Sequence, residues 1–143
     1  MDFVSSAGGC VVDVDVQEID LGLLGSQKAL SCPPDMAAVS ISARAWAAIE
    51  ETGYKGYDAL LPFRMALSHR EFPYTHNWHG LAALSAAVDS ALSEGLAAVY
   101  ARHEACAILC RSRVEALGLR VFPVLGASSP TITAVEVYRE NGA

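Results

Sequence analysis

The sequence predicts an α/β fold, because short strand-like runs alternate with longer helical patterns. Alternating apolar positions and β-branched residues indicate strands over residues 3–5, 21–24, 38–42, 119–122 and 131–137. Apolar residues spaced three and four apart indicate helices over residues 43–52, 78–93 and 96–117. At 143 residues the chain is long enough to form one domain with a core.

Glycine sets the predicted helix boundaries. Gly53, Gly95 and Gly118 each come directly after or just beyond one of the three helical patterns. Glycine adopts the left-handed conformation that ends many helices without a steric penalty. Residues 53–73 are rich in aromatic and turn-forming residues, so this stretch is predicted to connect the N-terminal strands to the C-terminal helices.

Lys28 is the residue that says most about function. It follows the strand-like run 21–24 and precedes Pro33-Pro34, which predicts a lysine held at the end of a strand. The only other lysine is Lys55. The apolar neighbours of Lys28 in the sequence predict desolvation, which favours the neutral, nucleophilic amine. Such an amine forms a Schiff base with an aldehyde cofactor.

The second informative segment is Asp2-Phe-Val-Ser-Ser-Ala-Gly-Gly9. An acidic residue beside apolar residues and a Ser-Ser/Gly-Gly turn is typical of the carboxyl end of a buried strand, where open α/β sheets bind their ligands. Pyridoxal phosphate chemistry needs a carboxylate that keeps the pyridine nitrogen protonated and a lysine that holds the aldehyde. Asp2 and Lys28 together therefore point to that chemistry.

These segments resemble the class V aminotransferases of fold type I, in particular the serine/alanine–glyoxylate branch. The resemblance lies in Asp-x-Val-Ser-Ser-x-Gly-Gly and in Gly25-Ser-Gln-Lys-Ala-Leu-Ser-Cys-Pro-Pro34. Cysteine desulfurases of the same class would be expected to show His-Lys where this chain has Gln-Lys. The resemblance continues through nearly the whole chain, at Phe72-Pro-Tyr-Thr-His-Asn-Trp-His-Gly-Leu81, Glu94-Gly-Leu96, Arg102-His-Glu104, Leu117-Gly-Leu119 and Ser129-Pro-Thr-Ile-Thr-Ala-Val135.

The resemblance implies a role for each residue around a bound pyridoxal 5'-phosphate. Lys28 would be the Schiff-base lysine and would carry protons between the α-carbon and the cofactor. Asp2 would pair with the pyridine nitrogen, Val4 would pack against the ring and Gln27 would bind the phosphate. No metal site is implied.

Tyr74 and Thr75 belong to a part of the site that the resemblance places at a homodimer interface. Thr75 would reach the phosphate of the neighbouring subunit's cofactor. The family often has tyrosine three residues before that threonine, where this chain has Phe72, so Tyr74 is a less direct match. Asp35 also departs from the pattern, because the family usually has glycine after Pro-Pro; a backbone with φ > 0 would then carry an aspartate.

The resemblance implies that residues 1–55 belong to the large cofactor-binding domain, 56–75 to a connection and 76–143 to the start of the small C-terminal domain. In the family, the phosphate loop and the ring-stacking aromatic precede the aspartate, and the arginine for the substrate carboxylate lies near the C-terminus. The chain is therefore interpreted as an interior segment, which is expected to be inactive and to self-associate when it is expressed alone.

The implied reaction is transamination between serine or alanine and glyoxylate or a similar 2-oxo acid. The implied setting is a soluble intracellular enzyme, in the cytoplasm or in an organelle such as the peroxisome or mitochondrion. Two alternatives stay open. The chain could be a catalytically silent remnant or interaction subunit of such an enzyme, or part of another class V lyase.

Composition limits the partners. The hydrophobic fraction is 52% and the mean hydropathy is +0.29, which predicts apolar surfaces that are covered by other parts of an assembly. No apolar run approaches the roughly 18 residues that span a bilayer. The net charge of -6 argues against nucleic acid or an anionic membrane as the partner.

Cysteine and histidine spacing gives little support for a metal site. His103, Cys106 and Cys110 share one face of the last predicted helix, but the four cysteines lack the paired spacing of a zinc site. The cysteines are therefore predicted to continue the apolar stripe of that helix. His76 and His79 are three residues apart, and His76 and Asn77 are predicted to form hydrogen bonds near the helix start instead of binding metal.

Overall fold

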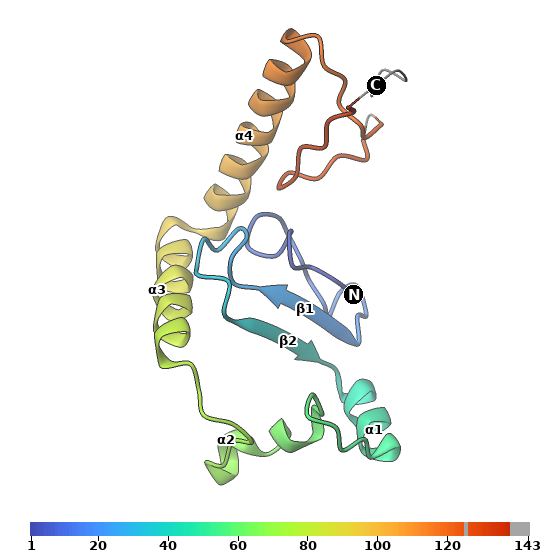
Figure 1. Cartoon of the computed structure of the whole chain (residues 1–143), viewed down its shortest axis with the longest axis vertical. Helices are drawn as coiled ribbons and strands as arrows, with labels where there is room; N and C mark the ends of the chain where they lie inside the picture. Colours follow the sequence, from blue (N-terminus) through green and yellow to red (C-terminus); the bar gives the residue numbers. More distant parts are fainter. Residues whose placement is uncertain (125, 138–143) are drawn as a thin grey trace, which may run out of the picture.

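The computed structural model describes residues 1–124 and 126–137 as a small antiparallel sheet with helices around it (Figure 1). The elements, in chain order, are strands β1 (Leu21–Gly25) and β2 (Ala37–Ile41), helix α1 (Ala43–Thr52), the 3-10 helix η1 (Leu61–Phe63), and helices α2 (Ala66–His69), α3 (Trp78–Glu94) and α4 (Leu96–Ala116). The predicted strands at 21–24 and 38–42 are thus confirmed within one residue at each end.

The N-terminal segment lies beside β1 on the edge opposite β2. Leu23 pairs with Val39 of β2 and forms a parallel bridge with Asp2. The Phe3 amide donates to the Leu23 carbonyl at 2.8 Å, and the Leu23 amide donates to the Met1 carbonyl at 3.0 Å. The strand predicted at 3–5 is wrong, because the chain turns after this one bridge: the Ala7 amide donates back to the Phe3 carbonyl at 2.9 Å.

Helix α1 has the predicted boundaries. Ser42 is its N-cap, with a hydroxyl that accepts a hydrogen bond from the Ala45 amide at 3.0 Å. Gly53 ends it in the left-handed conformation, at φ 59°, and its amide donates to the Ile49 carbonyl at 3.1 Å. The predicted connection after this helix contains only the short η1 and α2.

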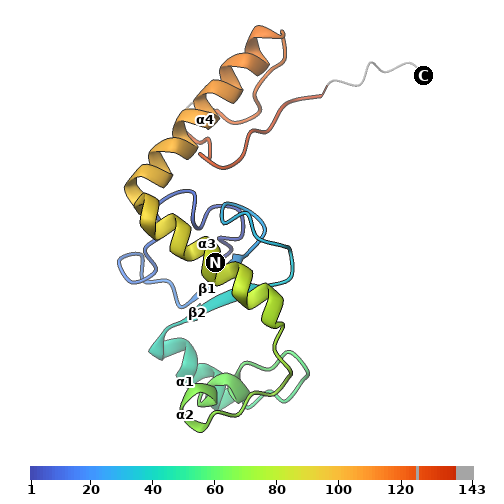
Figure 2. The same cartoon turned by 90° about the vertical axis from the view of Figure 1, so that its left-hand side faces the viewer.

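Helices α3 and α4 form an elbow on one side of the sheet (Figures 1 and 2). They meet at Gly95, which has φ 89°, and their axes differ by 91°. Across the bend, the Arg102 guanidinium donates two hydrogen bonds of 2.8 Å to the Glu94 carboxylate. Within the described residues no single helix is long and apolar enough to cross a membrane, although α3 and α4 together meet the length and composition of a bent span.

The C-terminal segment folds back along α4 without forming a strand in its described part. Val121 and Val135 form one antiparallel bridge, with the Phe122 amide donating to the Ala134 carbonyl at 2.9 Å. The strands predicted at 119–122 and 131–137 are therefore only paired segments. Two short strands without a third neighbour are marginal, which explains why pairing does not extend.

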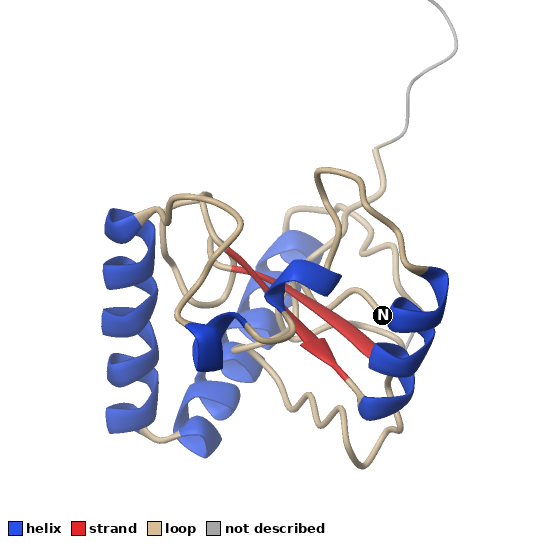
Figure 3. Ribbon diagram, turned by 90° about the horizontal axis from the view of Figure 1, so that it is seen from below, coloured by secondary structure: helices blue, strands red, loops and turns tan. Residues whose placement is uncertain are grey.

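The core is thin for a chain of this composition. Its buried apolar residues are mostly small: Phe3, Ala45, Ala59, Ala66, Val99 and Ala107. Figure 3 shows the two strands crossing the middle of the molecule with helices to either side. The sheet nevertheless leaves Leu21, Leu23 and Val39 about 40% exposed, at 41%, 40% and 41%. The apolar surface that the composition predicts is thus present.

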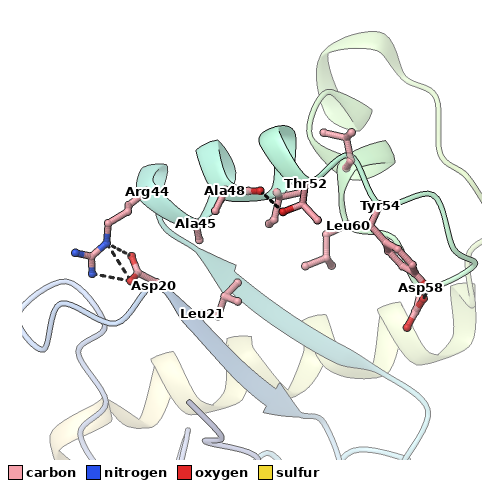
Figure 4. A pocket seen from close by; sticks show the side chains of 11 residues that line it. Asp20, Leu21, Arg44, Ala45, Ala48, Thr52, Tyr54, Asp58 and Leu60 are labelled. Atoms are coloured by element: carbon pink, nitrogen blue, oxygen red, sulfur yellow. Dashed lines mark hydrogen bonds and ion pairs between the residues drawn. The ribbon is translucent and has the colours of Figure 1, made fainter.

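A hollow of about 640 Å³ lies between α1, the start of β1 and the connection that follows α1 (Figure 4). Its walls are apolar, and an ion pair and a hydrogen-bonded pair stand at its two ends. Arg44 binds Asp20 at one end, with Nη2 to Oδ2 at 2.6 Å, and the Tyr54 hydroxyl donates to Asp58 Oδ1 at 2.9 Å at the other. Lys28 is not among the residues that line this hollow.

The surroundings of Gly80, in the first turn of α3, show how closely this helix packs against its neighbours. A Cβ atom there would lie 2.8 Å from Met36 Cγ, 2.8 Å from Asn77 Nδ2 and 2.9 Å from Asp35 Oδ1. Alanine gains about 1 kcal/mol over glycine in a helix, but overpacking costs about 1–3 kcal/mol. We expect Gly80→Ala to lower the free energy of unfolding in urea, whereas Ser85→Ala, at an exposed position of α3, should not. A Gly80→Ala variant at least as stable as the parent would contradict this close packing.

The Asp20 carboxylate gives the stability of this region a pH dependence. The hydrogen bonds from the Arg44 guanidinium and then from the Ser42 hydroxyl lower the pKa of Asp20 below 3.8. A pKa that is lowered in the folded state stabilises the fold above the unfolded pKa, and this contribution is lost as the pH falls through the folded pKa. The difference in melting temperature between the parent and Asp20→Asn should be constant near neutral pH and should shrink below pH 3.8. In an Arg44→Gln background, Asp20→Asn should change the melting temperature at neutral pH by less than it does in the parent. An equal change in both backgrounds would show that the Asp20–Arg44 pair does not cause the effect.

Candidate active site

Lys28 lies in the turn that follows β1, as predicted. The buried Ser26 closes this turn: its hydroxyl donates to the Pro33 carbonyl at 2.6 Å and accepts from the Met36 amide at 3.3 Å. The Ser26 amide also donates to the Met36 carbonyl at 3.0 Å. Both ends of the loop that carries Lys28 are therefore held by one side chain that is only 2% exposed.

The side chain of Lys28 is exposed, which corrects the expectation that its neighbours desolvate it. Of its apolar neighbours, Ala29 lines the same hollow as Lys28 and Leu30 lies against Gly8. Lys28 instead lines an open hollow of about 250 Å³ together with Ser5, His103 and Thr131. The amine is accessible to a reactant from solvent.

Asp2 and Val4 lie alongside β1, and Gln27 lies in the turn that follows it. Asp2 bridges to Leu23, and its Oδ1 accepts a hydrogen bond from the Val4 amide at 2.7 Å. A Cβ atom on Gly25 would lie 2.8 Å from Gln27 Oε1 and 3.0 Å from Val4 Cγ1. The two side chains thus meet over Gly25 and leave no room there for a side chain, at the strand end that precedes the Lys28 turn.

Gly9 is where the C-terminal part of the chain meets this site. A Cβ atom there would lie 2.4 Å from Thr131 Cγ2, and 3.2 Å from both Ala29 Cβ and His103 Cδ2. Sequence reasoning did not identify His103 or Thr131 as site residues. Both stand in the motifs Arg102-His-Glu104 and Ser129-Pro-Thr-Ile-Thr-Ala-Val135, so the signal that carried the resemblance also marked them.

The structure does not bring Tyr74 and Thr75 to Lys28. The Tyr74 hydroxyl donates to the Tyr57 carbonyl, and its ring lies 4.9 Å from that of Tyr57 and 6.0 Å from that of Phe63. Thr75 is exposed. Both residues lie in the segment between α2 and α3, near the end of the molecule opposite the tip of α4 (Figure 1). Their roles remain predictions.

Asp35 does not have the left-handed backbone that the glycine of the family pattern suggested. Among described residues other than glycine, only Glu18, Ser31 and Arg70 have positive φ. Instead, Asp35 Oδ2 accepts a hydrogen bond from Asn77 Nδ2 at 3.0 Å, and Asn77 Oδ1 accepts from the Gly80 amide at 3.0 Å. Asp35 therefore ties the lysine loop to the N-cap of α3, and the predicted role of Asn77 at the helix start is confirmed.

In the part of the chain that the structure describes, no group of three or more histidine, cysteine, aspartate or glutamate side chains could hold a metal ion. Cys106 and Cys110 are exposed on α4, so the prediction that they extend a buried apolar stripe is wrong. His103 Nδ1 lies 2.9 Å from the Val99 carbonyl oxygen of the same helix. His76 packs edge-on against Phe72, with ring centroids 4.2 Å apart.

Comparison with known proteins places this geometry in a family. No protein-family model matches the chain. An uncharacterized aminotransferase of Methanocaldococcus jannaschii is 37% identical over 139 residues, which cover 95% of the chain and 36% of that relative. The chain therefore spans about a third of the length of this relative.

Two solved structures extend the match to three dimensions. The pyridoxamine–pyruvate aminotransferase of Mesorhizobium loti superposes with a TM-score of 0.89 and 32% identity, covering 99% of the chain and 37% of that protein. The ureidoglycine–glyoxylate aminotransferase of Bacillus subtilis superposes with a TM-score of 0.87 and 31% identity, covering 96% of the chain and 36% of that protein. Since sequence and fold agree over nearly all of its residues, the chain is homologous to about a third of the class V aminotransferases of fold type I.

Proposed function

We propose that this chain supplies the cofactor-lysine segment of a pyridoxal-phosphate-dependent aminotransferase. The reaction would exchange an amino group between a small amino acid, serine or alanine, and glyoxylate or a similar 2-oxo acid. The observation that carries the proposal is that the segment with Asp2 and Val4 lies alongside β1, next to the turn that carries Gln27 and Lys28. The glyoxylate substrate named for the Bacillus subtilis relative supports the choice of acceptor.

The residues present fit the chemistry of pyridoxal phosphate. Lys28 offers an accessible primary amine for the aldehyde, and Asp2 offers a carboxylate for the pyridine nitrogen. Val4 and Gln27 meet over Gly25, so that the proposed ring contact and the proposed phosphate contact lie next to each other. Gln27 can donate an amide hydrogen to a phosphate oxygen. The donor set thus matches each part of the cofactor.

Each residue has a task that follows from its position. When bound, pyridoxal phosphate supplies an aldehyde for the amine and a ring that takes up electrons from the substrate. Lys28 Nζ, once released, would accept the proton of the substrate α-carbon as a general base. It would then donate that proton to the cofactor as a general acid. Asp2, oriented through Oδ1 by the Val4 amide, holds a proton on the pyridine nitrogen. Val4 excludes water from one side of the ring.

The same proposal includes a homodimer. Thr75 is exposed and stands far along the chain from the Lys28 loop, so it can contact the cofactor phosphate of a neighbouring subunit. The aromatic contacts of Tyr74 with Tyr57 and Phe63 hold the segment that presents it. The uncovered sheet face, with Leu21, Leu23 and Val39, adds apolar surface that an assembly can bury.

Lys28 can be tested with the chain itself. After incubation with pyridoxal phosphate and reduction with borohydride, peptide mapping should find the label on Lys28 and much less on Lys55, because Val4 and Gln27, the proposed ring and phosphate contacts, lie next to the Lys28 turn. Replacing the equivalent segment of the Mesorhizobium loti enzyme with this chain allows turnover to be measured too, and Lys28→Ala in that hybrid should abolish it. Equal labelling of the two lysines, or near-normal turnover of Lys28→Ala, would overturn the assignment.

Asp2→Asn separates electronic tuning from binding. In the hybrid enzyme it should leave labelling of Lys28 by the cofactor largely intact and lower kcat by orders of magnitude, because a neutral pyridine accepts electrons poorly. Asp13→Asn is a matched control on an aspartate of the next loop, and should leave kcat unchanged. An Asp2→Asn enzyme with the parental kcat would show that Asp2 has no such role.

A further inference from the structure

Arg111 joins α4 to the C-terminal segment that folds back beside this helix (Figures 1 and 2). Its Nη2 donates a hydrogen bond to the Ser129 carbonyl. The side chain is half-buried, and its Nε is buried without a hydrogen-bond partner among the described residues. A buried N–H of a charged group that lacks a partner lowers stability. The burial of Arg111 therefore points to a task other than stabilising the fold.

The residues next to this contact form a tight polar turn. Ser129 Oγ lies 2.9 Å from Thr131 Oγ1 and accepts a hydrogen bond from the Thr131 amide at 3.2 Å. Pro130, between them, has a fixed φ. Arg111 holds the backbone of Ser129, and the side chain of Ser129 holds Thr131. The guanidinium thus fixes the position of Thr131 through one residue.

Thr131 carries this position to the turn that contains Lys28. A Cβ atom on Gly9 would lie 2.4 Å from Thr131 Cγ2 and 3.2 Å from Ala29 Cβ, so both side chains meet the Gly9 turn. Thr131, Ala29 and Lys28 also line one open hollow. Packed contacts leave little free space and so transmit displacements. A shift of the Ser129–Thr131 turn would therefore move the neighbours of Lys28.

The spacing on α4 directs Arg111 toward these neighbours. His103, Ala107 and Arg111 follow one another at intervals of four residues, which places them on one face of the helix. Ala107 is 6% exposed, and a Cβ atom on Gly9 would lie 3.2 Å from His103 Cδ2, so this face packs against the rest of the molecule. Arg113, two residues further along the same helix, is exposed.

We propose that Arg111 is a positioning residue of the aminotransferase site, which fixes the Ser129–Thr131 turn beside the Lys28 turn and does not touch the reactants. The inference rests on the proposed role of Lys28. It adds a residue of α4 that lies in none of the motifs that carry the resemblance. Proton transfer at Lys28 requires a geometry held to within about 1 Å. A loose turn beside Lys28 should therefore slow the reaction more than it weakens substrate binding.

Hydrogen exchange on the chain itself measures the positioning directly. In Arg111→Met the Thr131 amide should exchange about tenfold faster than in the parent, as the loss of one hydrogen bond from a charged group would give. Arg113→Met, at the exposed position of the same helix, is the matched control and should leave this exchange unchanged. Equal exchange of the Thr131 amide in Arg111→Met and the parent would overturn the proposal.

Stability separates positioning from support of the fold. Methionine fills a similar volume and has no buried N–H that would lack a partner, so the free energy of unfolding of Arg111→Met in urea should equal or exceed that of the parent. If Arg111→Met is less stable and its amides exchange faster throughout the described residues, Arg111 only supports the fold and the proposal fails.

Turnover in the hybrid with the Mesorhizobium loti enzyme links the positioning to the reaction. Arg111→Met should lower kcat at least about tenfold and leave the KM for the amino donor nearly unchanged. Arg111→Lys should recover part of kcat, because an ammonium can donate to the Ser129 carbonyl. Arg113→Met should keep the parental kcat. Parental turnover of Arg111→Met, or no recovery with lysine, would contradict a positioning role.

The outcome is separable from the proposed function. If Lys28→Ala keeps turnover while Arg111→Met speeds exchange of the Thr131 amide, the Lys28 assignment fails and the hold of Arg111 on the turn stands. If Lys28→Ala abolishes turnover while Arg111→Met keeps the parental kcat and exchange, the positioning role is refuted and the Lys28 assignment stands.

Discussion

The hydrogen bonds of Ser26 are the constraint on which the rest of the structure depends. Its hydroxyl holds Pro33 and Met36, and its backbone pairs with Met36 and Cys32. A buried hydroxyl that lost these partners would leave several polar groups unsatisfied, so the loop has one shape. That shape sets where β2 begins, where Lys28 stands and where Asp35 meets Asn77 at the start of α3.

Close contacts at two glycines join this part of the chain to the elements packed around it. At Gly9 the N-terminal turn contacts Thr131 and His103, and at Gly80 the first turn of α3 contacts Met36 and Asp35. Any side chain at these positions would push the neighbouring elements apart, because packed interiors have little free space. The site is thus held from two sides by helices that are distant in the sequence, while its own apolar core is small.

The candidate site is divided between the N-terminal segment and the turn after β1. Asp2 bridges to Leu23 of β1, and Val4 meets Gln27 over Gly25. Lys28 is exposed in the turn and lines a hollow with His103 and Thr131 of the C-terminal half. Segments far apart in the sequence therefore meet at the lysine.

Local sequence determined the helices and the strand pair, because caps and periodicity act within a few residues: Ser42, Asn77 and the glycines at 53 and 95 set the boundaries that the structure shows. Motif resemblance likewise identified the fold family, whereas the roles of Asp2, Val4, Gln27 and Lys28 stay predictions. Only the tertiary structure decided that the 3–5 segment turns after one bridge, that Lys28 is exposed, that Asp35 binds Asn77 and that His103 and Thr131 border the lysine. Each of these depends on contacts between residues far apart in the chain, and neither periodicity nor propensity carries information on such contacts.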